Sequence, residues 1–433
     1  MASHNYKTVV LGGGAAAGYV AKAFNDSGKL SPNELLILGE ESVAAYERPA
    51  LSKAYLNPEG APRLPGFHTT VGGGGEKQDP AWYETHGIKY LMNTKVTSVD
   101  IKSRSLGLEG GDTVQYEKLI IATGARTVQL PAAKVPGADL TGLFYLRNVA
   151  DADALIVAMK AARDSGNKKV LVVGGGYIGL ECTAGLVNNG LEVTVVLPED
   201  RVLSRLFTPK MAAFYEDFYQ KKGVTFVKGS GVTAFEGTDG KVTGVVVKTG
   251  EITRTIPAAL VVVGVGARAN VEIFGDQLEL AAGGIKTNGQ LQTSDPNVYA
   301  VGDVAAFPLL ATGGAPARQE HIVNARMSAK HAVNAILGST EEYDYLPFFY
   351  SRVFNLSWQF YGVSEGEVVH FGDFEAGKFG AYWVRDGKVV GAFLESGSDA
   401  ENAAIKKVAA TRPDAGSPEE LSTAGVAFAM SKM

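Results

Sequence analysis

The first residues in this sequence suited to chemistry form a glycine-rich turn near the amino end. It runs Gly12, Gly13, Gly14, Ala15, Ala16 and Ala17, between a strand-like run and a helix-like one. The first glycine permits a tight turn, the next lets the backbone approach a pyrophosphate, and the third small residue lets helix pack on strand. Helix N–H groups would then bind phosphates. An acidic pair, Glu40-Glu41, ends the following strand, where a carboxylate can bind a ribose diol.

A second turn repeats this pattern more strictly, with Gly174, Gly176 and Gly179. Its next strand-like run, "EVTVVL", leads to Glu199, which would accept a hydrogen bond from the 2′-hydroxyl of NAD and repel a 2′-phosphate. Arg201 and Arg205 follow closely and could hold that phosphate. The spacing therefore predicts a second dinucleotide site, with NADH preferred and NADPH tolerated.

The stretch "YERPALSKAYL" offers two further cationic groups, Arg48 and Lys53. The chain has one cysteine, Cys182, which excludes an intrachain disulfide and a CxxC redox centre. We expect Cys182 to be a buried structural thiol within a helix.

Composition narrows the classes of function. Lys and Arg number 41 against 46 Asp and Glu, giving a net charge of −5 with no basic cluster, so we expect no nucleic-acid partner. No apolar run reaches the length of about 18 residues that spans a bilayer. The six histidines show no metal-binding spacing, so no metal site is predicted. A small-molecule substrate and no obligate protein partner are expected.

The two turns, each following a strand and opening a helix, predict an α/β fold with two doubly wound dinucleotide-binding domains. Beyond about residue 341 the sequence becomes rich in aromatic residues, and "GAYWVRDGKVVGAFLE" predicts a hairpin around Asp386-Gly387. A small C-terminal α+β domain is therefore expected. The predicted segments are residues 1–148 and 276–340 for the first domain, 149–275 for the second, and 341–433 for the third.

Further motifs give a resemblance to a known family. "ATG" at Ala122–Gly124 and Gly302-Asp303 in "VYAVGDV" resemble the two-dinucleotide flavoproteins that include glutathione reductase. The resemblance implies that the first turn holds FAD and the second NAD(P)H. Besides the first turn, the FAD residues it implies are Glu41, Arg48, Lys53, Val96, Arg147, Asp303 and Tyr350. The NAD residues it implies are Gly174, Gly176, Tyr177, Ile178, Gly179, Glu199, Arg205, Gly266, Glu320 and His321.

The segment "YERPALSK" is similar to the branch that contains ferredoxin reductases and monodehydroascorbate reductases, which lack the dithiol. This implies that Lys53 lies by the flavin and pairs with Glu181. A buried Lys–Glu pair there can hold the charge that develops on reduction.

Longer stretches resemble the plant monodehydroascorbate reductases: "RLPGFH", "WYETHGIK", "RLFTPKMAAFYEDFYQKKGV" and "YDYLPFFYSRVFNLSWQFYG". The resemblance implies that Arg326 and Tyr350 contact the ascorbate species, with Arg352 as a second cation. A guanidinium suits a small anion, and a tyrosine offers a flat face and a hydroxyl. Residues 309–321 and "GARAN", which lacks the usual proline, depart from the family pattern.

The implied reaction is reduction of the monodehydroascorbate radical to ascorbate, with a hydride from NADH to FAD and then single electrons to two radicals. One alternative is a ferredoxin or rubredoxin reductase of the same fold. Another is a signalling flavoprotein like the apoptosis-inducing factors. The tripeptide Ser431-Lys432-Met433 resembles the peroxisomal Ser-Lys-Leu address, so both a cytoplasmic and a peroxisomal location are considered.

Overall fold

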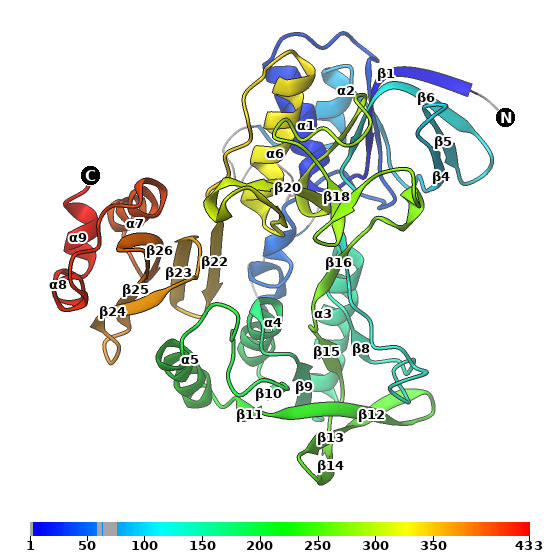
Figure 1. The fold of residues 1–433 in the computed structure, drawn as a ribbon. Coiled ribbons are helices and arrows are strands. Elements are labelled where there is room, and N and C mark those ends of the chain that lie inside the picture. Colours follow the sequence, from blue (N-terminus) through cyan, green and yellow to red (C-terminus); the bar gives the residue numbers. More distant parts are fainter. Residues whose placement is uncertain (1–2, 59–62, 64–75) are drawn as a thin grey trace. The chain divides into compact units, whose positions relative to one another are not determined.

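The structure is a computed structural model, and it describes residues 3–58, 63 and 76–433 (Figure 1). The chain forms two compact units, each assembled from separate stretches of sequence. Unit 1 comprises Met1–Arg48, Arg63–Arg126 and Arg268–Phe348, and unit 2 comprises Pro49–Pro62, Thr127–Ala267 and Phe349–Met433. Apart from Arg63, the family-like stretch "RLPGFH" lies outside the described residues.

Unit 1 is built on a seven-stranded sheet in the order β3-β2-β1-β6-β5-β4, with β19 also pairing with β6. Strands β3, β2, β1, β6 and β19 are parallel, and the apolar runs of β2, β1, β6 and β19 are buried, as expected for a sheet covered on both faces. The strands are β1 (Ser3–Leu11), β2 (Leu35–Leu38), β3 (Lys89–Leu91), β4 (Val96–Asp100), β5 (Ser105–Leu108), β6 (Thr113–Ile121) and β19 (Val298–Ala300).

The helices described in unit 1 include the one that begins at the first glycine turn. They are α1 (Ala15–Asp26), α2 (Pro80–Thr85) and α6 (Ile322–Ile336). Helix α1 follows β1 directly and packs against α6, although the two are far apart in the sequence (blue and yellow in Figure 1). Helices α1 and α6 therefore belong to one helical layer.

A smaller four-stranded sheet completes unit 1, in the order β17-β18-β20-β21. Its strands are β17 (Leu280–Ala281), β18 (Gly284–Lys286), β20 (Ala305–Leu309) and β21 (Ala315–Arg318). The short helix η5 (Gly302–Val304), which contains Asp303, leads into β20. The atypical loop after β20 reverses through Gly313 and Gly314, whose φ values of 81° and 83° favour glycine.

Unit 2 contains a second doubly wound sheet of five parallel strands, in the order β11-β10-β9-β15-β8. Its strands are β8 (Leu143–Phe144), β9 (Lys169–Val173), β10 (Glu192–Val196), β11 (Thr225–Val227) and β15 (Val261–Val263). The helices are α3 (Val149–Asp164), α4 (Tyr177–Asn188) and α5 (Pro209–Lys221). An antiparallel sheet of β12 (Ser230–Thr238), β13 (Lys241–Thr249) and β14 (Ile252–Pro257) adjoins them.

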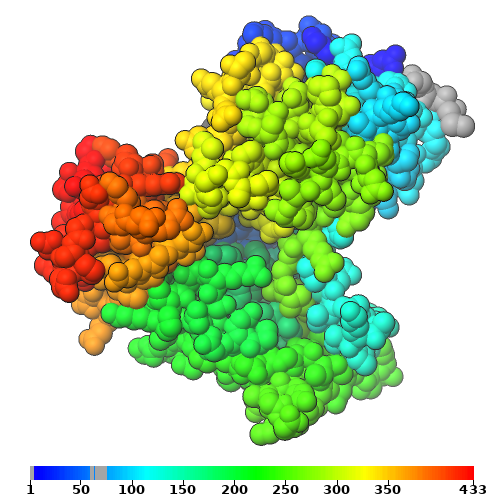
Figure 2. Space-filling model, in the orientation of Figure 1, coloured from blue at the N-terminus to red at the C-terminus, as the bar shows by residue number. Residues whose placement is uncertain are grey.

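The C-terminal part of unit 2 is an antiparallel sheet in the order β22-β23-β26-β25-β24, covered by three helices. These elements are β22 (Phe348–Val353), β23 (Leu356–Gly362), β24 (Glu367–Asp373), β25 (Lys378–Arg385), β26 (Lys388–Glu395), α7 (Asp399–Thr411), α8 (Pro418–Ala424) and α9 (Val426–Met430). Their residues gather into one body in Figure 2 (orange to red). Asp386 and Gly387 have the positive φ of a hairpin turn between β25 and β26, so that predicted hairpin is confirmed.

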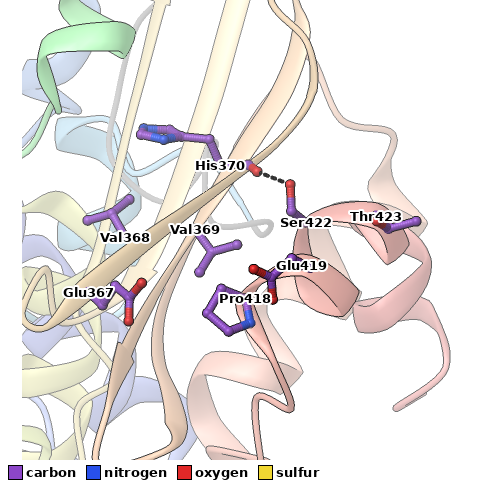
Figure 3. Close-up of a pocket in the computed structure, with 8 residues that line it drawn as sticks. All are labelled: Glu367, Val368, Val369, His370, Pro418, Glu419, Ser422 and Thr423. Carbon is purple, nitrogen blue, oxygen red and sulfur yellow. Dashed lines mark hydrogen bonds between the residues drawn. The ribbon is translucent and has the colours of Figure 1, made fainter.

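A shallow cleft of about 480 Å³ lies between β24 and α8 (Figure 3). The Ser422 hydroxyl donates a hydrogen bond of 2.7 Å to the carbonyl of His370 at this place. The cleft is lined by Glu367, Val368, Val369, His370, Pro418, Glu419, Ser422 and Thr423. None of the predicted site residues is among them.

The two doubly wound sheets and the C-terminal α+β part confirm the predicted fold class. The four predicted segment ranges stay a prediction, because the units gather residues from several segments. Every helix among the described residues is too short or too polar to cross a bilayer. The same residues contain no group of acidic, histidine or cysteine side chains able to hold a metal ion.

A buried carboxylate joins α5 to the C-terminal sheet in unit 2. Glu395 is 1% exposed and accepts hydrogen bonds from the Tyr215 hydroxyl, the Ser357 N–H at 2.9 Å and the Ser396 hydroxyl at 2.8 Å. Burial raises the pKa of Glu395 above its ordinary value of 4.5, and these hydrogen bonds oppose the rise only in part.

We expect Glu395→Gln to flatten the pH dependence of stability. Because the folded pKa of Glu395 is raised, its contribution to the free energy of unfolding is complete below pH 4.5 and is lost as the pH rises through the folded pKa. Glutamine does not titrate. As the pH rises through the folded pKa of Glu395, the free energy of unfolding of the variant should therefore increase relative to that of the wild type. Urea denaturation across the range measures it, and parallel curves would contradict the expectation.

Candidate active site

The first glycine turn of unit 1 has the geometry of a phosphate cradle. Gly12 has φ +118°, and a Cβ there would collide with the Ala122 carbonyl, so only glycine fits. Helix α1 begins just after Gly14, and no described side chain caps its first N–H groups. These N–H groups are therefore available to an anion, and the turn fits a dinucleotide pyrophosphate.

Arg48 lies beside this turn. Its guanidinium forms an ion pair with Glu41 and donates a 2.7 Å hydrogen bond to the Tyr46 hydroxyl. A Cβ on Gly14 would lie 3.5 Å from Nη2 of Arg48. Burial opposes the guanidinium charge, but Tyr46, Glu41 and Asp303 together raise its pKa above the ordinary value.

The other FAD residues predicted for unit 1 lie near this group. Asp303 is one of the charges acting on Arg48, and Val96 begins β4. Asn93 and Thr94, just before Val96, donate backbone hydrogen bonds of 3.0 and 2.8 Å to the carbonyls of Glu41 and Gly39. These backbone bonds join the segment before Val96 to the main chain at Glu41, the residue predicted to bind the ribose.

The second glycine turn, in unit 2, repeats the cradle. Gly174 has φ +108° and abuts the Gly264 carbonyl, and Gly179 packs against Gly174 so closely that a Cβ would collide. A Cβ on Gly176, at the start of α4, would meet no described atom within 4 Å. Ile178 is 43% exposed at this helix end. The turn thus fits a second pyrophosphate.

The ribose end of this second turn carries the predicted selectivity residues. Glu199 follows β10 and is exposed. Arg201 is paired with Asp200 at 3.1 Å and donates to the Phe207 carbonyl at 3.3 Å. Arg205 is exposed and lies near Tyr177, since burial raises the pKa of Tyr177 and the Arg205 charge opposes that rise. Of the two arginines, Arg205 is thus the one with its side chain in solvent.

Other residues predicted to bind NAD or FAD lie at the ends of strands and helices. Gly266 has φ +118° and follows the exposed Val265 just beyond β15. In unit 1, Glu320 pairs with Arg318 at 2.7 Å, and Nδ1 of His321 accepts from the Val323 N–H at the start of α6. Arg147 of unit 2 precedes α3.

Lys53 and Glu181 form an ion pair within unit 2, as the family resemblance implies. The Lys53 ammonium lies 2.9 Å from Oε2 of Glu181, donates to the Pro49 carbonyl at 3.2 Å, and lies 5.5 Å from the centre of the Tyr350 ring. Glu181 is 3% exposed. A buried carboxylate therefore fixes the ammonium above an aromatic face.

Two buried hydroxyls also donate to the Glu181 carboxylate. Ser52 donates to Oε2, and Ser351 donates to Oε1 at 2.6 Å. Cys182, the next residue on α4, is fully buried, and burial raises the pKa of its thiol above the ordinary value. The buried carboxylate thus accepts hydrogen bonds from donors on both of its oxygens.

Arg326 lies on α6 in unit 1. Its Nη2 is 2.9 Å from both carboxylate oxygens of Glu47, and its guanidinium lies 5.5 Å from the centre of the Tyr19 ring. The Tyr19 hydroxyl donates to Glu47 at 2.6 Å. Burial and the Glu47 carboxylate raise the pKa of Tyr19 above its ordinary value. The predicted cation for the acceptor is therefore held by a buried carboxylate.

Comparisons with known proteins now decide the family. Residues 6–335 match the pyridine nucleotide-disulphide oxidoreductase family, and residues 346–429 match the C-terminal domain of the monodehydroascorbate reductase 3-like proteins. A peroxisomal monodehydroascorbate reductase 2 of Oryza sativa is 52% identical, covering 98% of this chain and 88% of that protein. The Solanum lycopersicum monodehydroascorbate reductase is 49% identical, over 99% of both chains.

The chain belongs to the monodehydroascorbate reductase family. The family resemblance predicted from the sequence is confirmed.

Solved structures of related reductases share the fold of this chain. A ferredoxin reductase from Rhodopseudomonas palustris has a TM-score of 0.86 and 30% identity over 98% of this chain and 100% of its own. Putidaredoxin reductase, in covalent complex with putidaredoxin, has a TM-score of 0.87 and 27% identity over 99% of both chains.

Some site residues of this monodehydroascorbate reductase family member were not predicted from the sequence. Glu47, Ser52 and Ser351 hold the predicted Arg326 and Glu181, yet none of them carries a spacing signal. "YERPALSK" contains Glu47 and Ser52, so the resemblance located their segment without indicating their contacts. Arg352, beside Ser351, is exposed on β22. The roles of the predicted site residues stay a prediction.

Proposed function

We propose that this protein is an NAD(P)H-dependent FAD enzyme that reduces the monodehydroascorbate radical to ascorbate. The observation that carries the acceptor is similarity over nearly the whole chain to relatives named for that reaction. The two glycine turns, each with a helix start open to an anion, support two dinucleotides. A redox dithiol plays no part, because the chain has one cysteine.

In this proposal the chain's own side chains stabilise charge beside the flavin and bind the anionic acceptor. FAD, when bound, links the two-electron chemistry of a nicotinamide to one-electron chemistry. The Lys53 ammonium, held by Glu181, stabilises negative charge beside the reacting ring system. Arg326, held by Glu47, attracts the anionic radical, and Tyr350 offers it a flat face. Arg352 adds a second positive charge.

Turnover with two acceptors tests the proposed function. NADH oxidation should accelerate when ascorbate and ascorbate oxidase generate the radical, and a ferredoxin should support far slower turnover. Faster turnover with ferredoxin would favour the alternative protein acceptor, which the ferredoxin reductase fold makes a specific candidate. Slow reoxidation by both acceptors would favour a signalling flavoprotein.

We expect NADH to be preferred over NADPH through Glu199. The exposed carboxylate would accept from a ribose 2′-hydroxyl and repel a 2′-phosphate, while Arg205 gives NADPH partial compensation. Glu199→Gln should shrink the ratio of kcat/KM for NADH to that for NADPH by about 10-fold, the scale of one like-charge contact near a surface. Steady-state kinetics with both donors measure the ratio. A preference of the wild type for NADPH would overturn the assignment. Glu192→Gln is the control, because Glu192 is an exposed carboxylate at the start of β10.

A peroxisomal location is proposed alongside a cytoplasmic one. Two related proteins, from Oryza sativa and Arabidopsis thaliana, are named as peroxisomal. The resemblance of Ser431-Lys432-Met433 to a peroxisomal address supports the same location. Imaging an amino-terminally tagged chain, with and without this tripeptide, distinguishes the two compartments.

A further inference from the structure

The Glu181 carboxylate depends on different donors at its two oxygens. Oε2 accepts from the Lys53 ammonium and the Ser52 hydroxyl. Among the described residues, Oε1 accepts from the Ser351 hydroxyl alone, at 2.6 Å. Removing the Ser351 hydroxyl would therefore leave one oxygen of a buried carboxylate without a protein donor, whereas Oε2 would keep one donor if Ser52 were changed.

Ser351 also lies at a particular place on β22. It is 4% exposed, and its neighbours in the strand are Tyr350 and Arg352, both predicted to contact the acceptor. Successive side chains of a strand project to opposite faces. The Ser351 side chain points into the protein, and the next residue, Arg352, is exposed on the other face. A hydrogen bond from Ser351 to α4 therefore fixes the strand segment that carries both neighbours.

The same contact reaches Lys53. Glu181 holds the Lys53 ammonium at 2.9 Å, and that ammonium lies over the Tyr350 ring at 5.5 Å. Ser351 contacts Glu181, Glu181 contacts Lys53, and Lys53 contacts Tyr350. Tyr350 is covalently joined to Ser351 as its neighbour in β22, so the four residues form a closed ring of contacts. A change in the direction of the Glu181 carboxylate would move the ammonium relative to the ring.

We propose that Ser351 is a positioning residue that orients the Glu181 carboxylate and, through it, the Lys53 ammonium and the Tyr350 ring. The inference rests on the proposed function for the roles of Lys53 and Tyr350. Independently of those roles, the Ser351 hydroxyl determines where the Lys53 ammonium lies. Because hydrogen bonds to a charged group are stronger than neutral ones, the effect is measurable.

The test compares Ser351→Ala with Ser351→Thr in the FAD-loaded protein. Alanine should lower the midpoint potential of the bound flavin, because a displaced ammonium stabilises added negative charge less well. It should also lower kcat with the generated radical about 10-fold. Threonine keeps the hydroxyl and fits a strand, so it should restore both values. Ser357→Ala, on neighbouring β23, is the matched control and should leave both unchanged.

A double-variant cycle separates positioning from general packing. In a Glu181→Gln background, Ser351→Ala should change the potential much less than in wild type, because the charged partner is already absent. An equal change in both backgrounds, or a wild-type potential in Ser351→Ala, would overturn the proposal. Should Ser351→Ala fail to retain FAD, Ser351→Cys is the second test, because its thiol fills the space of the hydroxyl but donates only weakly. This variant should also lower the potential of the bound flavin, and a wild-type potential would overturn the proposal.

Failure of this inference is distinct from failure of the proposed function. Wild-type turnover with the radical decides the function and uses no variant. The potential of the bound flavin needs no acceptor, so it reports on Ser351 even if the radical proves not to be the substrate.

Discussion

Replacing Lys53 with methionine should lower kcat with the generated radical by about 100- to 1000-fold, the usual loss when one preorganised charge is removed from an active site. The reason is that Lys53 supplies the positive charge, while Glu181 only holds it in place. Methionine keeps much of the length of the side chain and its apolar packing. The loss should therefore appear in kcat and in the rate of flavin reduction by NADH, with FAD still bound.

Stopped-flow reduction by NADH, followed at the flavin absorbance, measures this prediction. Lys160→Met is the matched control, because Lys160 forms an exposed i,i+4 pair with Asp164 on α3 of the same unit. Such surface pairs contribute little. A wild-type reduction rate in Lys53→Met would remove Lys53 from the chemistry and leave its pair with Glu181 a structural one.

Arg326→Ala should raise KM for the radical by about 100-fold, the scale of a charge-assisted contact to an anion. NADH-driven flavin reduction should stay close to wild type, because Arg326 is assigned to the acceptor and not to the donor. Loss of flavin reduction would move Arg326 out of the acceptor site.

Arg326→Ala has a second expected effect, on stability. Glu47 is 7% exposed and would lose its cationic partner, retaining the Tyr19 hydroxyl. The free energy of unfolding should fall by about 3 kcal/mol, the low end for a broken buried pair, because the Arg326 side chain is 24% exposed. Adding Glu47→Gln should restore much of this stability and none of the affinity. Recovery of KM in the double variant would contradict the assigned role.

The parts of the site that follow short sequence patterns could be predicted well. Gly12 and Gly174 adopt the positive φ that their turns require, and each turn opens a helix after a strand. These features depend on neighbouring residues, so spacing alone specifies them. The hairpin at Asp386-Gly387 is predictable for the same reason.

Contacts between distant segments were predicted only where the family resemblance named both partners. Lys53 and Glu181 are such a pair. The Ser351–Glu181 and Glu47–Arg326 contacts join residues far apart in the sequence, and a serine between a tyrosine and an arginine has no pattern of its own. Arg201 looked as able as Arg205 to hold a phosphate, and only the structure shows its pairing with Asp200.

The burial of Cys182 has a consequence for the durability of the catalyst. Oxidants and alkylating agents attack the thiolate, so a thiol that is both inaccessible and high in pKa reacts slowly with peroxide or electrophiles. Since this is the only cysteine in the chain, sulfenylation and mixed disulfides have no ready target. Peroxide around such a protein therefore finds no accessible thiolate to oxidise, whereas an enzyme that relays electrons through a surface dithiol presents two.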